Sequence, residues 1–224
     1  MSDISKDLAL FNELVEVLIN EEEQNPVAER IDSTKLYDSI DLSLNESAMI
    51  DDAFKTVLRN VLISNPKTAT NLFFNQLFGG RQSKAILGDL LAVMLNNSMY
   101  TYKAAGAQIG VEKVILRAVC DMIGWDKNSD GTLAPGGSMT NFMSMLMARD
   151  AASSEVRSSG MQGKMIVYTS RESHYSTPKN AAFCGIGRDN VRYVSTDEKG
   201  CINVSELEQA IEKDLKEGLL PMMV

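Results

Sequence analysis

Residues 164–176 read KMIVYTSRESHYS, an apolar run followed by a polar segment that carries the only histidine of the chain, His174. The run KMIVYTS predicts a buried β-strand, because it is short, apolar and rich in branched and aromatic side chains. The imidazole that follows can change charge near neutral pH, and its flat ring can also lie on another flat ring. A structural histidine held by hydrogen bonds is the third alternative, and for a histidine considered alone it is the commoner one.

Helical and strand-like patterns alternate on both sides of this run. Apolar periodicity predicts helices at 138–153, 176–184 and 204–216, and apolar runs predict strands at 164–170, 191–195 and 219–224. Alternation of this kind, with short loops, favours parallel βα units. We therefore expect an α/β fold in the C-terminal part of the chain.

The N-terminal part shows helical patterns only. They predict helices at 7–23, 45–63, 83–97 and 106–124. The last of these is apolar on more than one face, so we expect it to be well buried. We expect an N-terminal helical segment, residues 1–105, and the first part of an α/β domain, residues 106–224, which begins with the helix at 106–124.

The apolar run LLPMMV, residues 219–224, predicts a buried strand with no helix after it. A parallel sheet of three strands would leave broad apolar faces open. We therefore expect the chain to be the front part of a longer protein, truncated within its α/β domain. The alternative is a short edge strand that ends a small domain.

Composition excludes several classes of function. The chain has 224 residues, 44% of them hydrophobic, and a net charge of −8, which argues against a nucleic-acid partner. Its three cysteines include no close pair, so neither a disulfide framework nor a metal site is expected. The start MSDISKDLAL lacks the apolar core of a signal peptide, and no apolar stretch is long enough to cross a bilayer. We expect a cytoplasmic protein without membrane attachment.

The stretch APGGSMTN, residues 134–141, places two glycines at the predicted start of a helix. Ser138, Met139 and Thr140 would then supply free N–H groups at the helix N-terminus, where an anion such as a phosphate is favoured. The hydroxyls of Ser138 and Thr140 could add donors. A plain helix cap explains the same residues, and the stretch matches neither a Walker A loop nor a GxGxxG motif.

A second polar group lies among aromatic residues in FFNQLFGG, residues 73–80. Asn75 and Gln76 there would either cap a turn or orient a polar ligand in a pocket. The spacing alone favours the structural interpretation.

Six stretches, taken in order, resemble one family: FFNQL, MYTY, IGW, DGTLAPGGSMTN, SRESHYS and GRDNV. They are similar to the group II pyridoxal-phosphate-dependent amino acid decarboxylases, in the branch of glutamate and cysteine sulfinate decarboxylases. The similarity covers about residues 65–224. The resemblance implies a fold-type-I architecture, pyridoxal 5′-phosphate as cofactor, an acidic amino acid as small-molecule substrate, and a homodimer with active sites at the subunit interface.

The resemblance also implies roles for single residues. Gly137 and Ser138 match the positions that hold the cofactor phosphate. His174 matches the catalytic histidine that stacks on the cofactor ring. Gln76 matches a residue near the side-chain carboxylate of the substrate, with Asn75 beside it.

One departure from the family concerns the lysine that binds the cofactor covalently. In the family it lies in a His-Lys motif, and no lysine of this chain stands in such a motif. We expect this lysine, and the aspartate that faces the ring nitrogen, outside residues 1–224, so that only the complete protein decarboxylates glutamate, aspartate or cysteine sulfinate. The alternatives are a non-catalytic remnant that binds a partner subunit or a phosphorylated ligand, and a plain interaction domain.

Overall fold

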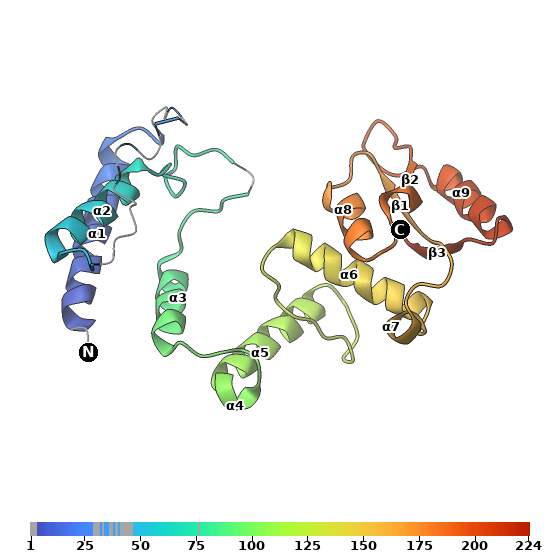
Figure 1. Cartoon of the computed structure of the whole chain (residues 1–224), viewed down its shortest axis with the longest axis horizontal. Coiled ribbons are helices and arrows are strands. Elements are labelled where there is room, and N and C mark those ends of the chain that lie inside the picture. Colours follow the sequence, from blue (N-terminus) through green and yellow to red (C-terminus); the bar gives the residue numbers. More distant parts are fainter. Residues whose placement is uncertain are drawn as a thin grey trace. The chain divides into compact units, whose positions relative to one another are not determined.

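The computed structural model describes residues 4–28, 32, 34–35, 38, 40, 47–75 and 77–224. The chain forms two compact units, a first unit of Met1–Ser98 and a second unit of Met99–Val224 (Figure 1). The boundary that the sequence predicts, between residues 105 and 106, stays a prediction.

The described secondary structure of the first unit is helical. Its helices are α1 (Ile4–Gln24), α2 (Asp51–Ser64) and α3 (Ser83–Leu95). α1 packs against α2, where Lys55 forms an ion pair of 2.6 Å with Glu13. The three predicted helices are confirmed, although the one predicted at 45–63 begins only at Asp51.

The second unit contains the predicted parallel sheet. Its strands are β1 (Met165–Ser170), β2 (Val191–Val194) and β3 (Leu220–Met223), in the order β2-β1-β3. All six residues of the central strand β1 are buried, as expected for a strand with a neighbour on each side and helices above and below. The three strands lie where the apolar runs predicted them.

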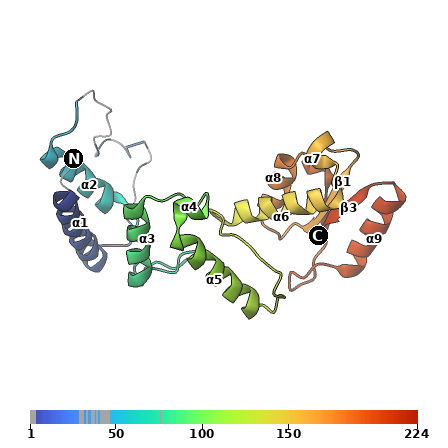
Figure 2. The same ribbon diagram turned by 90° about the horizontal axis from the view of Figure 1, so that it is seen from below.

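Helices cover both faces of this sheet. The helices of the second unit are α4 (Tyr102–Ala105), α5 (Ala107–Met122), α6 (Gly137–Ala152), α7 (Val156–Ser159), α8 (Ser176–Phe183), the 3-10 helix η1 (Arg188–Asn190) and α9 (Val204–Lys216). α6 packs against α8, and the sheet lies between this pair and α9 (Figures 1 and 2). The short elements α4, α7 and η1 were not predicted.

The core of the second unit joins α6, α8 and the sheet. Its buried apolar residues include Met145 of α6, Val167 of β1 and Ala181 of α8. Phe142 and Phe183 add an edge-to-face ring contact between α6 and α8, with ring centroids 6.5 Å apart. These contacts fix the start of α6 and the start of α8 relative to the central strand.

A buried polar network attaches α9 to the other face of the sheet. The Tyr168 hydroxyl of β1 donates a hydrogen bond of 2.8 Å to Asp214 of α9, and Arg192 of β2 forms an ion pair of 3.1 Å with the same carboxylate. Burial, together with the hydrogen bond to Asp214, raises the pKa of the Tyr168 phenol above its usual range. The network therefore supplies Asp214 with the partners that a buried carboxylate requires.

The burial predicted for the helix at 106–124 is wrong for this chain. Only Cys120 of α5 is buried, whereas five apolar side chains are 46–84% exposed: Val111, Val114, Ile115, Val119 and Met122. The second unit, as described, has no element that covers them. α3 is likewise apolar and has no buried residue. No helix among the described residues is long and apolar enough to span a membrane.

We predict that Asp214→Ala lowers the free energy of unfolding of the second unit by roughly 3 kcal/mol, because it leaves the buried Tyr168 hydroxyl without its acceptor and Arg192 without its counter-charge. Urea unfolding followed by the fluorescence of Trp125, the only tryptophan, measures this change. Glu212→Ala on the same helix is the control, since its ion pair with Lys216 is exposed and is worth less than about 0.5 kcal/mol. Equal effects of the two variants would contradict a structural role of the network.

Candidate functional site

The N-terminus of α6 presents free backbone donors. Gly136 precedes the helix at φ 109°, a conformation that favours glycine, and its carbonyl accepts from the N–H groups of Met139 (3.0 Å) and Thr140 (3.2 Å). The N–H groups of Gly137 and Ser138 make no hydrogen bond within the described part of the chain. The free donors are therefore those of Gly137 and Ser138, and the prediction was wrong for Met139 and Thr140.

The side chains near this helix start also include one hydroxyl that is hydrogen-bonded within the chain and one that is free. The Thr140 hydroxyl donates to the Gly137 carbonyl at 2.8 Å, so it is not available as an outward donor. The Ser138 hydroxyl has no hydrogen-bond partner among the described residues. A Cβ built on Gly137 would meet no atom within 4 Å, so the space beside its backbone is open. The helix dipole, two N–H groups and one hydroxyl are a donor set that suits a phosphate.

A cation from α5 holds the loop that leads to this helix start. Arg117 donates to the carbonyl oxygens of Trp125 (3.3 Å), Asp126 (3.1 Å) and Ser129 (3.1 Å). At the far end of the loop, Glu112 accepts from the backbone N–H of Leu133 at 3.2 Å. The loop between α5 and α6 is thus tied to α5 at both ends.

His174 lies in the loop between β1 and α8, beyond the carboxyl end of the central strand. It is exposed, and its Nδ1 atom lies 2.9 Å from the Ser176 hydroxyl oxygen. The ring of Tyr175 lies beside the imidazole, with centroids 4.3 Å apart and an angle of 36° between the planes. In parallel α/β sheets, ligands bind outside the carboxyl ends of the strands, which is where this histidine stands.

Two side-chain hydrogen bonds join the histidine loop to the first turns of α6. Asn141 of α6 donates to the Ser176 hydroxyl at 2.8 Å, and Asn180 of α8 donates to the Ser138 carbonyl at 3.2 Å. Ser176 and Asn180 are both buried. The structure therefore brings Gly137, Ser138 and His174 to one edge of the sheet.

The sequence alone did not indicate the three linking residues, Asn141, Ser176 and Asn180. Asn141 is separated from Ser176 by 35 residues. A signal was nevertheless present: Ser176 follows His174 by two residues, a spacing at which a hydroxyl can reach the imidazole of the same turn.

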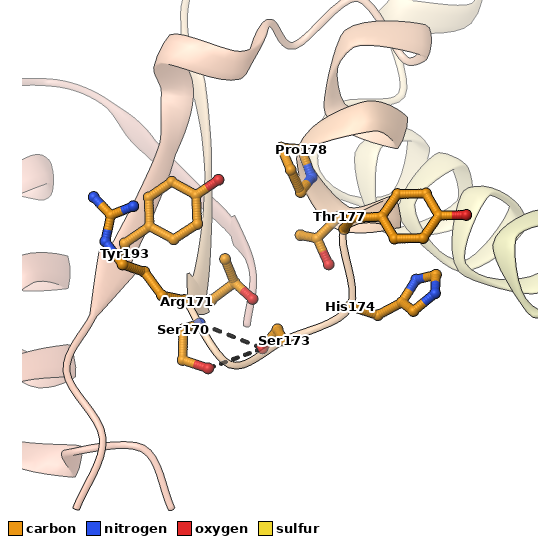
Figure 3. A pocket seen from close by; sticks show the side chains of 9 residues that line it. Ser170, Arg171, Ser173, His174, Thr177, Pro178 and Tyr193 are labelled. Atoms are coloured by element: carbon orange, nitrogen blue, oxygen red, sulfur yellow. Dashed lines mark hydrogen bonds between the residues drawn. The ribbon is translucent and has the colours of Figure 1, made fainter. Parts of the chain in front are cut away.

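A pocket of about 240 Å³ opens next to His174. Figure 3 shows Arg171 and Tyr193 on one side of it, and Thr177, Pro178 and His174 on the other. The Arg171 guanidinium lies 4.9 Å from the centre of the Tyr193 ring, a cation–π contact. Arg171 gives this pocket a positive charge that suits an anionic group.

Asn75 and Gln76, the predicted substrate-binding pair, belong to the first unit. The Asn75 side chain accepts a hydrogen bond of 2.7 Å from the backbone N–H of Leu77, which makes it the cap of a local turn. Gln76 lies outside the described residues. The substrate role of both residues stays a prediction.

The described residues contain no group of three or more histidine, cysteine, aspartate or glutamate side chains that could hold a metal ion. The donors at the start of α6 suit an anion, and the exposed imidazole suits a flat ring. The residues of the site thus fit a phosphorylated aromatic cofactor.

Comparison with known proteins assigns the chain to a family. The family described as "Pyridoxal-dependent decarboxylase conserved domain" matches residues 35–224, which include the start of α6 and His174. This range covers the whole second unit. The resemblance seen in the motifs is thereby confirmed.

Individual relatives agree with this assignment. The chain is 33% identical to acidic amino acid decarboxylase GADL1 of Xenopus tropicalis, over 88% of its own length and 39% of the relative's. It is 34% identical to cysteine sulfinic acid decarboxylase of Mus musculus, over 88% of its length and 40% of the relative's. The crystal structure of mouse CSAD matches with a TM-score of 0.90 and 31% identity, over 98% of this chain and 48% of that chain.

The predicted fold class is confirmed by the same match, because the helices and the parallel sheet of this chain match about half of the solved chain with a TM-score of 0.90. The chain spans about two fifths of the length of the curated relatives that it matches. This chain belongs to the pyridoxal-dependent decarboxylase family.

Proposed function

We propose that the complete protein containing this chain removes the α-carboxylate of an acidic amino acid with the aid of pyridoxal 5′-phosphate. The observation that carries the proposal is that two free N–H groups at the start of α6 lie at the same edge of the sheet as the exposed imidazole of His174. Hydrogen bonds from Asn141 to Ser176 and between Ser176 and His174 link the two. The names of the relatives support the substrate class, since one acts on acidic amino acids and another on cysteine sulfinic acid. Glutamate, aspartate and cysteine sulfinate are the candidate substrates.

The chain's own residues would hold the cofactor at two points. The N–H groups of Gly137 and Ser138, with the Ser138 hydroxyl, would bind the phosphate at the positive end of the α6 dipole. The imidazole of His174 would lie against the cofactor ring and exclude water from one of its faces. When bound, the cofactor accepts the electron pair that remains after carbon dioxide leaves.

Other groups of the reaction are proposed outside residues 1–224. They are the lysine that binds the cofactor covalently and the aspartate that faces the ring nitrogen. Within the chain, Asn75 and Gln76 are proposed to face the side-chain carboxylate of the substrate. The runner-up function is a non-catalytic chain that binds a phosphorylated ligand at the start of α6.

We also propose that the complete protein is a cytoplasmic homodimer. The exposed apolar side chains of α3 and α5 are surfaces that the complete protein must cover, and a second subunit is one way to cover them, because soluble proteins rarely leave such surfaces open. Sedimentation velocity of the complete protein should give twice the mass of one polypeptide. A monomer at micromolar concentration would contradict the assembly.

The central test is a carbon dioxide release assay on the complete protein with pyridoxal 5′-phosphate and each candidate substrate. We predict activity on at least one of the three, and a loss of about a hundredfold in kcat for His174→Ala, because a group at the reacting centre is removed. The free energy of unfolding should change by about 1 kcal/mol or less, since His174 is exposed.

Glu172→Ala is the matched control for this test, because Glu172 is an exposed residue of the same loop. Its activity should equal that of the wild type. Full activity in His174→Ala would show that the imidazole does not serve the reaction, and no activity of the wild type on any candidate would contradict the decarboxylase itself.

Substitutions at the two glycines at the start of α6 test cofactor binding and folding stability separately. Gly137→Ala should leave the stability of the chain unchanged, since the added Cβ meets no atom within 4 Å and alanine favours a helix. The same variant should weaken pyridoxal 5′-phosphate binding about tenfold, because the methyl group fills the space beside the free N–H groups. Gly136→Ala should instead lower the free energy of unfolding by roughly 1–3 kcal/mol, because its φ of 109° strains any other residue.

Cofactor absorbance titration and urea unfolding measure the two quantities for both variants of the complete protein. Unchanged cofactor affinity in Gly137→Ala would place the phosphate elsewhere.

A further inference from the structure

The Ser176 side chain contacts two groups of the candidate site at once. Its hydroxyl oxygen accepts from Asn141 Nδ2 at 2.8 Å and lies 2.9 Å from His174 Nδ1. Ser176 has no exposed surface, so water does not compete for these contacts.

The hydrogen bonds around Nδ1 of His174 determine which ring nitrogen carries the hydrogen. The backbone N–H of Ser176 donates to Nδ1 at 3.2 Å. Because Asn141 already donates to the Ser176 hydroxyl oxygen, the hydroxyl hydrogen is free to point at Nδ1 as well. A nitrogen that accepts carries no hydrogen of its own, so the neutral ring has its hydrogen on Nε2.

These contacts determine the orientation of the imidazole plane of His174 and which of its nitrogen atoms faces outward. Nδ1 is held by Ser176, and the Tyr175 ring lies 4.3 Å from the imidazole on one side. Nε2 makes no hydrogen bond to any described residue. The second face of the ring and the Nε2–H group are therefore the parts of His174 that remain for a ligand.

We propose that Ser176 is a positioning residue which, together with Asn141, fixes the orientation and the tautomer of His174. Asn141 orients the serine hydroxyl, the serine holds Nδ1, and the ring presents Nε2–H. The same two residues tie this ring to the helix whose start has the free N–H groups, so the ring and the anion site keep a constant relation. The effect on catalysis rests on the proposed function, whereas the state of the ring does not.

Nuclear magnetic resonance of the 224-residue chain tests the ring state without cofactor or substrate. His174 is the only histidine, so a sample labelled with ¹⁵N-histidine and made without a histidine tag shows a single imidazole. Long-range ¹⁵N–¹H correlation at alkaline pH should give a non-protonated Nδ1 and a protonated Nε2, with widely separated ¹⁵N shifts. The same sample in concentrated urea supplies the averaged shifts of a free imidazole as the reference.

Variants of Ser176 and Asn141 test whether the serine hydroxyl determines the tautomer of the His174 ring. Ser176→Ala should move the two ¹⁵N shifts toward their values in urea, and Ser176→Thr, which keeps a hydroxyl, should restore the wild-type pattern. Asn141→Ala should give a smaller change in the same direction, and it carries the test if Ser176→Ala does not fold. A protonated Nδ1 in the wild type, or a Ser176→Ala spectrum equal to that of the wild type, would overturn the proposal.

Kinetics of the complete protein then test the consequence for the reaction. Ser176→Ala should lower kcat about tenfold, the equivalent of one hydrogen bond, with little change in KM, and Ser176→Thr should recover the rate. An inactive wild type would contradict the proposed function and leave the ring state to be decided by the spectra. A normal kcat in Ser176→Ala, with an altered ring spectrum, would show that the tautomer does not matter for the reaction.

Discussion

The second unit depends on one constraint: the buried side chain of Ser176 must satisfy its hydrogen bonds without water. It does so by accepting from Asn141 and by contacting His174 Nδ1, so α6, the loop after β1 and the start of α8 meet at one point. Asn180 adds the bond to the Ser138 carbonyl on the same side. The free N–H groups of α6 and the only histidine of the chain are consequently held at one edge of the sheet, where a ligand of a parallel α/β fold is expected.

On the opposite face of the sheet, a buried polar network attaches helix α9 to the strands. Tyr168 and Arg192 direct their polar groups to Asp214 of α9, which is buried with its charge balanced. The two faces thus have different tasks. The face with α9 contributes stability, whereas the edge beside α6 and α8 leaves the N–H groups at the start of α6 free to bind a ligand.

Much of this arrangement could be predicted from the sequence, because it depends on patterns local to each element. The apolar runs around Val167, Val191 and Met222 predicted the strands, and the resemblance of the motifs to a known family indicated Gly137, Ser138 and His174 as candidate site residues. The sequence could not show that the Gly136 carbonyl accepts from Met139 and Thr140, since that depends on the backbone angles at the helix start. It also could not show the bond between Asn141 and Ser176, which are 35 residues apart, nor the exposure of α5, which depends on which elements pack against it.

The central claim is that the start of α6 and His174 hold one cofactor. A crystal structure of the complete protein grown with pyridoxal 5′-phosphate tests this most directly. The account predicts phosphate oxygens within hydrogen-bonding distance of the Gly137 and Ser138 N–H groups, and the cofactor ring in contact with the face of the His174 imidazole that Tyr175 leaves free. A phosphate bound away from α6, or a cofactor ring without contact to His174, would contradict it.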